Sequence, residues 1–353
     1  MRTITADSTP RPRKPNTVGN PEIDARVRQL VDDMGTDKPH ELIEEMIITA
    51  LKMARDQTSV ADLKMLNRAL KEMRYASRVF SPYRDRRKVT VFGSARTPDD
   101  APEAIAAEEF GRKMRDNGFM IVTGGGDGIM GAAQRGAGRE ASFGLNILLP
   151  FEQSANETIL GDAKLINFNY FFTRKLNFMK ETHAIALFPG GFGTFDEGCE
   201  ALTLMQTGKA RIFPIVLVDK PGGNYWQTWI DFLRNHLLKL RLISPDDFHL
   251  LHQATSVDDA IAHITQFYKN FHSYRWLGSR LIMRLQQPLT QNHIEKMDTE
   301  FSDILASGKF EQTSGAVPGE NSDPEIAHLP RLVFQPRRRN FGRLRQVIDA
   351  VNV

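Results

Sequence analysis

Two glycine-rich segments of this 353-residue chain have the composition and spacing of phosphate-binding turns. They are Gly124-Gly125-Gly126-Asp127-Gly128-Ile129-Met130-Gly131 and Pro189-Gly190-Gly191-Phe192-Gly193-Thr194, and each one separates an apolar run from a helical pattern. Where a strand leads into a helix, the first helical amides lack partners and the positive end of the helix dipole faces outward. Such a turn suits a phosphate, and glycine lets the phosphate approach closely because it has no Cβ.

Acidic residues follow the second glycine segment. Glu197 comes three residues after Thr194, so we expect it in the first turn of a helix, with Asp196 beside it and Glu200 one turn later. Acidic side chains at the start of a helix also occur simply because they complement the helix dipole. These residues alone leave both interpretations open.

Two cations, Arg174 and Lys175, follow an apolar run that ends in Tyr170-Phe171-Phe172. This run predicts a strand that precedes the strand of the second glycine segment. The carboxyl ends of parallel strands lie at one edge of a sheet, so we expect the two cations near the glycine turns. A cation pair and a carboxylate beside a phosphate cradle match the needs of a sugar phosphate.

Three other interpretations have less support in the sequence. Residues 126–131 match the dinucleotide pattern G-x-G-x-x-G, but they follow the second strand of the predicted domain, and only Glu152 could contact the ribose of NAD. Glycines that serve only as tight turns explain one segment better than two. His249 and His252 have the spacing of metal ligands but no evident partner ligands. We therefore expect neither a metal nor a cofactor.

The elements that must position these residues alternate between apolar runs and helical patterns. Buried strands are predicted at 89–93, 120–123, 143–149, 166–172, 184–188 and 213–218, and helices at 101–117, 128–140, 174–182, 194–208, 225–239 and 257–271. Fully apolar strands separated by helices are typical of a parallel sheet that is covered on both faces. The predicted fold class is α/β, a doubly wound, Rossmann-like parallel sheet.

The rest of the chain flanks this domain. We expect a flexible tail at 1–20, a helical segment at 21–85 with Ser59 as a helix N-cap, the nucleotide-binding domain at 86–272 and a C-terminal extension at 273–353. In the extension, residues 329–335 predict a strand and residues 341–351 a helix.

Composition excludes several other classes of protein. The net charge is +3, from 46 basic and 43 acidic residues, and the basic clusters Arg84–Lys88 and Arg337–Arg339 are interpreted as solvated ends of elements, so no nucleic-acid partner is expected. The single cysteine, Cys199, is expected in the core and fits a reducing compartment. No run of about 18 apolar residues and no signal peptide occurs. We expect a cytoplasmic protein without a membrane partner.

The order and spacing of the charged and glycine residues resemble the LONELY GUY family of phosphoribohydrolases. The resemblance rests on Arg174-Lys175 followed by Pro189-Gly190-Gly191-x-Gly193-Thr194-x-x-Glu197. Further matches are Thr123-Gly-Gly-Gly-x-Gly-Ile-Met130, Leu145-Asn-Ile-x-Leu-Pro150-x-Glu-Gln153 and Leu202-Thr-Leu-x-Gln206-Thr. The resemblance covers residues 86–272 and points to the longer bacterial type, because the short members lack both flanking regions.

The resemblance implies a role for each matched residue. Arg174 and Glu197 would be the residues on which activity depends, and Met130 would line the base site. The substrate and its phosphate would contact Gly190, Gly191, Gly193, Thr194, Lys175, Asp196 and Glu152, and we add Gly124, Gly125, Gly126 and Ser94 to this set. The sequence departs from the family at Gly198-Cys199, where two bulky aliphatic residues usually follow the glutamate.

The implied function is hydrolysis of the N-glycosidic bond of AMP or a related purine nucleotide, cytokinin nucleotides included, to the free base and ribose 5-phosphate. The alternative is a nucleotide- or cofactor-binding carrier or sensor on the same fold, without turnover. Members of the family are often labelled lysine decarboxylases, but no lysine here stands in a context for a pyridoxal phosphate Schiff base. The family also implies a homodimer or higher homo-oligomer, for which Ala201–Met205 is a candidate contact.

Overall fold

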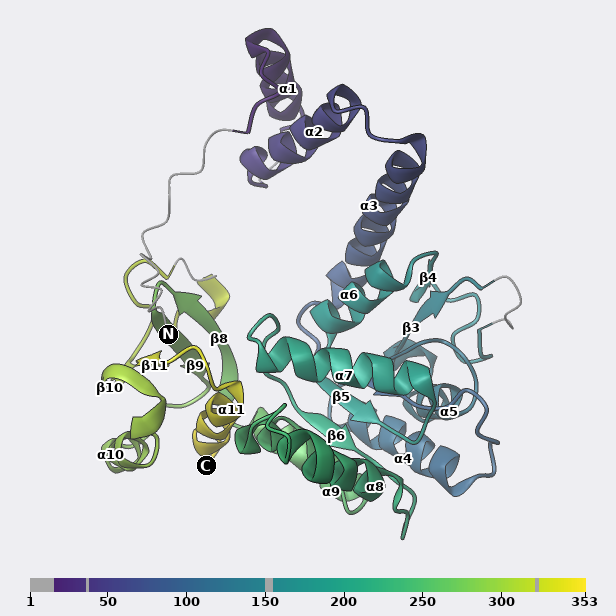
Figure 1. Cartoon of the computed structure of the whole chain (residues 1–353), viewed down its shortest axis with the longest axis vertical. Helices are drawn as coiled ribbons and strands as arrows, with labels where there is room; N and C mark the ends of the chain where they lie inside the picture. Colours follow the sequence, from purple (N-terminus) through teal and green to yellow (C-terminus); the bar gives the residue numbers. More distant parts are fainter. Residues whose placement is uncertain (1–15, 36–37, 150–154, 321–323) are drawn as a thin grey trace. The chain divides into compact units, whose positions relative to one another are not determined.

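A computed structural model describes residues 16–35, 38–149, 155–320 and 324–353 of the chain (Figure 1). The chain divides into two compact units, Met1–Arg74 and Tyr75–Val353. The described part of the first unit is helical and contains α1 (Pro21–Asp33), α2 (His40–Arg55) and most of α3 (Val60–Phe80). The Ser59 hydroxyl accepts a hydrogen bond from the Asp62 amide at 3.1 Å, which confirms Ser59 as the N-cap of α3.

The second unit contains a seven-stranded parallel sheet in the order β4-β3-β2-β1-β5-β6-β7. The strands are β1 (Lys88–Phe92), β2 (Met120–Thr123), β3 (Ser142–Ile147), β4 (Leu165–Phe168), β5 (Ala184–Leu187), β6 (Ile215–Leu217) and β7 (His252–Gln253). Six of them match predicted strands, and the two-residue β7 was not predicted. The order reverses direction between β1 and β5, which makes the carboxyl ends of these two strands the switch point of a doubly wound sheet.

Helices cover both faces of this sheet, as the apolar strands require. One face packs against α4 (Pro102–Asp116), α5 (Ile129–Ala137) and α9 (Val257–Phe267), with Phe110 and Ile264 in its core. The other packs against α6 (Phe171–Glu181), α7 (Phe192–Gln206) and α8 (Tyr225–Phe232), with Phe178 and Trp226 in its core. The α/β prediction is therefore confirmed.

The predicted boundaries were wrong at α6 and at α8. β4 ends at Phe168 and α6 begins at Phe171, so Phe171 and Phe172 lie on the first turn of a helix with exposed side chains instead of in a buried strand. A short apolar run does not distinguish a strand from a helix start. The predicted helix at 225–239 is also divided, because α8 ends at Phe232 and a π-helical stretch, Leu233–Leu238, follows it.

A second, antiparallel sheet follows in the order β10-β11-β9-β8. Its strands are β8 (Phe271–Leu277), β9 (Arg280–Leu285), β10 (Leu305–Thr313) and β11 (Arg331–Pro336), and α10 (Gln291–Glu300) and α11 (Phe341–Ala350) share its core. The predicted strand at 329–335 and helix at 341–351 correspond to β11 and α11, whereas β8, β9 and β10 were not predicted. The division of the chain at residues 20, 85 and 272 stays a prediction. Among the helices that the structure describes, none is long and apolar enough to cross a membrane.

Candidate functional site

The two glycine turns are joined by Ser94, which directly follows β1 and Gly93. The Ser94 amide donates a hydrogen bond to the Pro189 carbonyl at 3.1 Å, and the Ser94 carbonyl accepts one from the Ile129 amide at 3.0 Å. Since β1 lies between β2 and β5, the loops that follow these three strands meet at the carboxyl edge of the sheet. The predicted convergence of both turns at this edge is present in the structure.

The first turn depends on positive backbone angles and on a buried asparagine. Gly125 and Gly128 have φ angles of 82° and 61°, and a Cβ on Gly128 would lie 2.4 Å from the Ser94 carbonyl oxygen. Asn156 donates from Nδ2 to the carbonyls of Gly125 at 3.0 Å and Gly126 at 2.9 Å. Sequence reasoning missed Asn156, because the turn that it fixes lies thirty residues away along the chain.

The second turn leads into α7, and two of its three glycines face open space. A Cβ on Gly190 would lie 2.2 Å from the Thr194 hydroxyl oxygen, whereas a Cβ on Gly191 or Gly193 would meet no atom within 4 Å. Gly191 is the N-cap of α7, and its carbonyl accepts from the amides of Thr194 at 3.1 Å and Phe195 at 3.3 Å, so the amides of Phe192 and Gly193 precede the first helical hydrogen bonds. Tyr225 donates from its hydroxyl to the Gly190 carbonyl at 2.6 Å and fixes the turn, a role that the sequence did not reveal.

Arg174 lies against the first glycine turn. Its Nε donates to the Leu145 carbonyl at 2.7 Å, and its guanidinium carbon stands 5.2 Å from the centroid of the Phe178 ring. A Cβ on Gly124 would lie only 2.5 Å from Arg174 Nη2 and 2.9 Å from Met130 Sδ. Both side chains therefore flank Gly124, and the first glycine of the turn is needed to admit them.

Lys175 is bound by three carboxylates of α7. Its Nζ lies 2.8 Å from Asp196 Oδ2, 2.7 Å from Glu200 Oε2 and 3.8 Å from Glu197 Oε2. Partial burial by itself lowers the pKa of Lys175, but the hydrogen bonds to Asp196 and Glu200 outweigh it and raise the pKa above its ordinary value. Lys175 is therefore firmly cationic and holds the acidic face of α7 toward α6.

Glu197 is the buried member of this acidic group, with 7% of its surface exposed. The pKa of Glu197 is raised to about 7, mainly by burial. The charges of Lys175 and Arg174 lower this pKa, and the charges of Glu200 and Asp196 raise it. The prediction that Glu197 lies in the first turn of its helix was wrong, since α7 begins at Phe192 and its first turn contains no acidic residue. Complementing the helix dipole therefore does not explain Glu197.

Most residues of the predicted set thus lie at one edge of the sheet. Glu152 lies outside the described residues. Gly198 allows α7 to pack closely on β5, because a Cβ there would lie 2.8 Å from Leu187 Cδ1. Cys199 is exposed, so its predicted place in the core was wrong: it sits on the outer side of α7, one residue after the buried face.

A doubly wound sheet with two glycine turns, paired cations and a buried carboxylate at its switch point places this chain among the Rossmann-like α/β proteins. A family model described as "Possible lysine decarboxylase" matches residues 130–264, a range that contains the second glycine turn, Arg174 and Glu197. The match therefore covers the residues on which the predicted resemblance rests.

Two relatives point the same way. The protein "Probable cytokinin riboside 5'-monophosphate phosphoribohydrolase LOGL5" of Oryza sativa subsp. japonica is 26% identical over 186 residues, which cover 51% of this chain and 72% of that protein. "Cytokinin riboside 5'-monophosphate phosphoribohydrolase LOG1" of Arabidopsis thaliana is 24% identical over 190 residues, with 51% and 84% covered. These matches confirm the resemblance of the α/β domain to the LONELY GUY family.

Among solved structures, the Moco carrier protein from Chlamydomonas reinhardtii is similar to 51% of this chain and 96% of its own length. The sequence identity is 22% and the TM-score is 0.35.

Proposed function

We propose that the protein hydrolyses the N-glycosidic bond of a purine nucleoside 5'-monophosphate, AMP or a close relative, and releases the free base and ribose 5-phosphate. The observation that carries this proposal is the buried Glu197, whose pKa is raised to about 7, at the sheet edge that also holds two cations and two glycine turns. The relatives named as phosphoribohydrolases support the same reaction class.

The glycine turns would hold the 5'-phosphate. The open space at Gly191 and Gly193 leaves room for phosphate oxygens near the first amides of α7, where the helix dipole is favourable. Thr194 is buried at the same turn. The phosphate is remote from the scissile bond, so its binding energy would position the ribose for reaction.

Glu197 would act on the anomeric carbon. Cleavage of a ribosyl C–N bond builds positive charge on the sugar, as in glycoside hydrolysis, and an ionised carboxylate beside C1' stabilises that charge. A carboxylate with a pKa near 7 also accepts a proton from the attacking water efficiently at neutral pH. The attacking water forms the new C1'–O bond and gives a proton to Glu197, the C1'–N bond breaks, and the base leaves with its electron pair and takes up a proton from solvent.

Arg174 and Met130 would complete the substrate contacts. Arg174 is held by the Leu145 carbonyl and carries a planar guanidinium suited to phosphate or ribose oxygens. Met130 flanks Gly124, as Arg174 does, and offers an adaptable apolar surface for the base.

A lysine decarboxylase activity does not fit these residues. It would need pyridoxal phosphate on a lysine whose amine is activated by a lowered pKa. Lys175, the lysine of this site, has a raised pKa and is engaged by Asp196 and Glu200.

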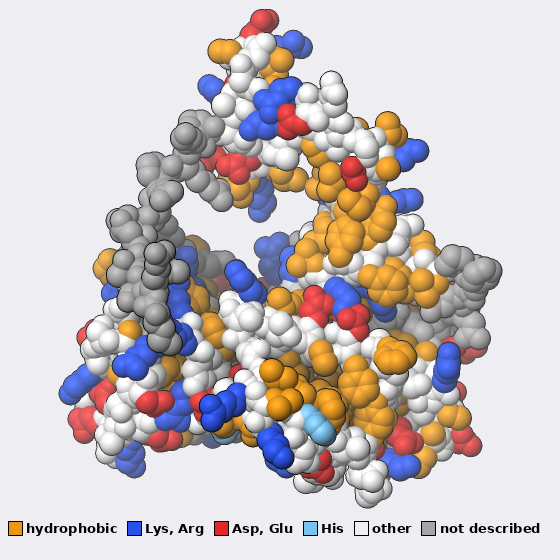
Figure 2. All heavy atoms as spheres, in the orientation of Figure 1, with side chains coloured by type: hydrophobic (Ala, Val, Ile, Leu, Met, Phe, Trp, Pro, Cys, Tyr) orange, Lys and Arg blue, Asp and Glu red, His pale blue; other side chains and the backbone are white. Residues whose placement is uncertain are grey.

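We also propose that the protein is a homodimer or a higher homo-oligomer. On the face shown in Figure 2, hydrophobic side chains gather over α6, α7 and α8. Exposed members of these helices include Phe171, Phe172, Leu176, Phe192 and Phe232. An exposed apolar surface of this kind is typical of a protein interface. The predicted contact at Ala201–Met205 is less suitable, because Ala201 and Met205 are fully buried within the subunit.

The test is incubation of the full chain with AMP and, separately, with adenosine, followed by chromatography for adenine and an assay for ribose 5-phosphate. We expect cleavage of AMP and little cleavage of adenosine, because adenosine has no phosphate for the glycine turns. Equal turnover of both would contradict the assigned phosphate site. Tight binding of AMP without release of adenine would favour the carrier function instead.

A further inference from the structure

A cavity lies at the edge of the parallel sheet opposite the glycine turns. It has a volume of about 750 Å³, within the usual range for small-molecule sites, and all of its lining residues belong to the unit Tyr75–Val353. Residues just before β1, β2, β5 and β6 contribute to its wall, namely Arg87, Phe119, His183 and Arg211. In a parallel sheet these positions all lie at the amino edge, whereas the glycine turns follow the carboxyl ends of the strands.

Four arginines line this cavity: Arg84, Arg86, Arg87 and Arg211. In the described part of the chain, none of the four forms an ion pair with a carboxylate, and the carboxylates in the lining are Asp85 and Glu325. The sequence interpretation of Arg84–Lys88 as a solvated cluster is correct for Arg84 and Arg86, but wrong for Lys88, which is buried, and for Arg87, which is half-buried. The cavity therefore carries an excess of positive charge.

The protein holds two of these arginines in place without neutralising them. The Arg87 guanidinium carbon lies 4.2 Å from the centroid of the Tyr268 ring, and Tyr268 donates from its hydroxyl to the His183 carbonyl at 2.6 Å. Arg211 donates from Nη2 to the Thr182 carbonyl at 2.7 Å. Aromatic and carbonyl partners orient a guanidinium but leave its charge uncompensated.

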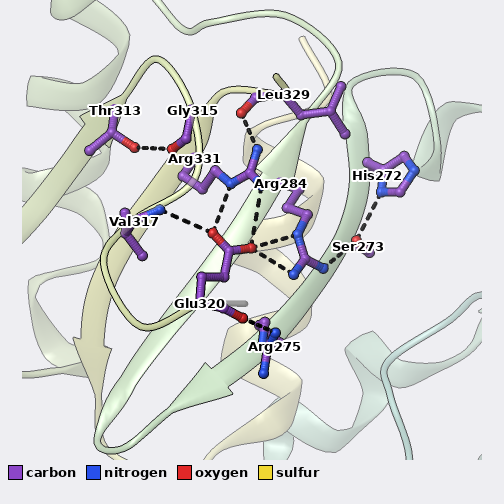
Figure 3. Close-up of polar contacts among 10 residues, drawn as sticks. All are labelled: His272, Ser273, Arg275, Arg284, Thr313, Gly315, Val317, Glu320, Leu329 and Arg331. Atoms are coloured by element: carbon purple, nitrogen blue, oxygen red, sulfur yellow. Dashed lines mark hydrogen bonds and ion pairs between the residues drawn. The ribbon is translucent and has the colours of Figure 1, made fainter. Parts of the chain in front are cut away.

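The far wall of the cavity is held by a buried ionic cluster in the antiparallel sheet (Figure 3). Arg284 donates to Glu320 Oε1 at 2.6 Å and to the Ser273 hydroxyl at 3.1 Å, and His272 Nδ1 lies 2.8 Å from the same hydroxyl. Arg331 donates to the other carboxylate oxygen of Glu320 at 3.1 Å.

This cluster of Glu320, Arg284 and Arg331 positions two residues of the cavity lining, His272 and Ser273. Glu320 also accepts a hydrogen bond from the Val317 amide at 3.2 Å. A carboxylate that accepts hydrogen bonds from two buried guanidinium groups is costly to displace. The wall of the cavity is therefore expected to be preformed in the free protein.

Two histidines in the lining have lowered pKa values. Burial and the charges of Arg211, Lys88 and Arg87 lower the pKa of His183 to about 3. Burial and the charges of Arg87, Arg284 and Arg331 lower the pKa of His272. Both rings are therefore neutral at physiological pH.

We propose that this cavity binds a small molecule that carries two or more phosphate groups, held by Arg84, Arg86, Arg87 and Arg211. Guanidinium groups match phosphate oxygens with paired hydrogen bonds, and four of them suit more than one anionic group. This site is separate from the glycine turns, so it does not depend on the proposed hydrolase activity.

The test is calorimetric titration of the full chain with inorganic pyrophosphate, and with citrate as a carboxylate of similar charge. We expect pyrophosphate to bind, and the exposed double variant Arg84→Ala/Arg86→Ala and the single variant Arg87→Gln each to weaken it at least tenfold. Arg112→Gln and Arg234→Gln remove exposed arginines elsewhere and should leave the affinity unchanged. Circular dichroism and the melting temperature check that each variant is folded.

Arg174→Ala separates this cavity from the glycine turns. Pyrophosphate binding that persists in Arg174→Ala and disappears in the cavity variants supports the proposal. Binding that disappears only in Arg174→Ala, or a complete absence of pyrophosphate binding at millimolar concentration, overturns it. Binding of citrate but not of pyrophosphate overturns the assignment to phosphate compounds.

Discussion

The two edges of the parallel sheet use charge in opposite ways. At the carboxyl edge each cation has a nearby acid: Lys175 contacts Asp196, Glu197 and Glu200, and Arg174 lies near enough to Glu197 to lower its pKa. At the amino edge the arginines of the cavity face aromatic rings and carbonyls instead of carboxylates. A group that contains both carboxylates and cations can move a proton and stabilise changing charge. A group of arginines without paired carboxylates is suited to attracting an anion.

The backbone sharpens the same contrast. Helices α5 and α7 begin at the carboxyl edge and present amides there, so little cationic side-chain charge is needed to bind a phosphate. Helices α4 and α6 end at the amino edge and present carbonyls, which repel anions. Several arginines are therefore needed at the amino edge to make a site for the same chemical group.

The largest expected effect is at the carboxyl edge. Glu197→Gln keeps the size of the side chain but removes the charge that faces the developing cation, so base release from AMP should fall by about a hundredfold or more, or about 3 kcal/mol. Affinity for AMP, measured by calorimetry, should survive because the phosphate contacts that we propose are backbone amides, which the substitution does not change. Glu200→Gln on the same helix is the matched control and should cost far less. Native turnover by Glu197→Gln would place the catalytic carboxylate elsewhere, with Asp196, Glu200 and Glu152 as the remaining candidates.

Arg174→Ala should damage binding and turnover together. It removes a charged hydrogen-bond donor to the substrate, which corresponds to a loss of about tenfold to a hundredfold in affinity. Calorimetry with AMP and the rate of adenine release at saturating AMP measure the two effects separately. A loss of turnover with unchanged affinity would show that Arg174 acts only in the transition state.

The pH dependence tests the state of Glu197. Its pKa is raised to about 7, so the carboxylate is ionised above this pH and protonated below it. If the ionised form is required, kcat/KM for AMP should be constant above pH 8 and fall by about tenfold for each pH unit below 7. The second ionisation of the AMP phosphate, with a pKa of about 6, adds to the decline at lower pH. Glu197→Gln should retain only that second decline, and a profile identical to the native one would refute the assignment.

The smallest expected effect concerns the amino edge. Burial and the charges of Arg211, Lys88 and Arg87 hold the pKa of His183 at about 3. A bound pyrophosphate adds negative charge nearby and should raise this pKa. Titration of the His183 ring followed by NMR, with and without pyrophosphate, measures the change. An unchanged His183 titration at saturating pyrophosphate would place the anion outside the cavity.

The sequence determined the carboxyl edge almost completely. The apolar runs predicted six of the seven parallel strands, and each glycine segment stands between its strand and its helix, so convergence at one edge followed from parallel topology alone. Two errors there were local, whereas Asn156 and Tyr225 were missed because they fix the glycine turns from distant positions in the chain. The start of α6 was misplaced because Tyr170-Phe171-Phe172 suits a strand and a helix equally, and Glu197 was assigned to the wrong turn because the exposed Phe192 was not recognised as helical.

Only the tertiary structure decided the amino edge and the state of the buried groups. Arg87, His183, Arg211 and Tyr268 come from four separate parts of the chain and share no motif, so nothing local predicts that they line one cavity. Strand β8 carries partly exposed polar residues and gives no apolar run to detect. The pKa of Glu197 depends on what surrounds it, and burial is a property of packing between elements that no local sequence pattern contains.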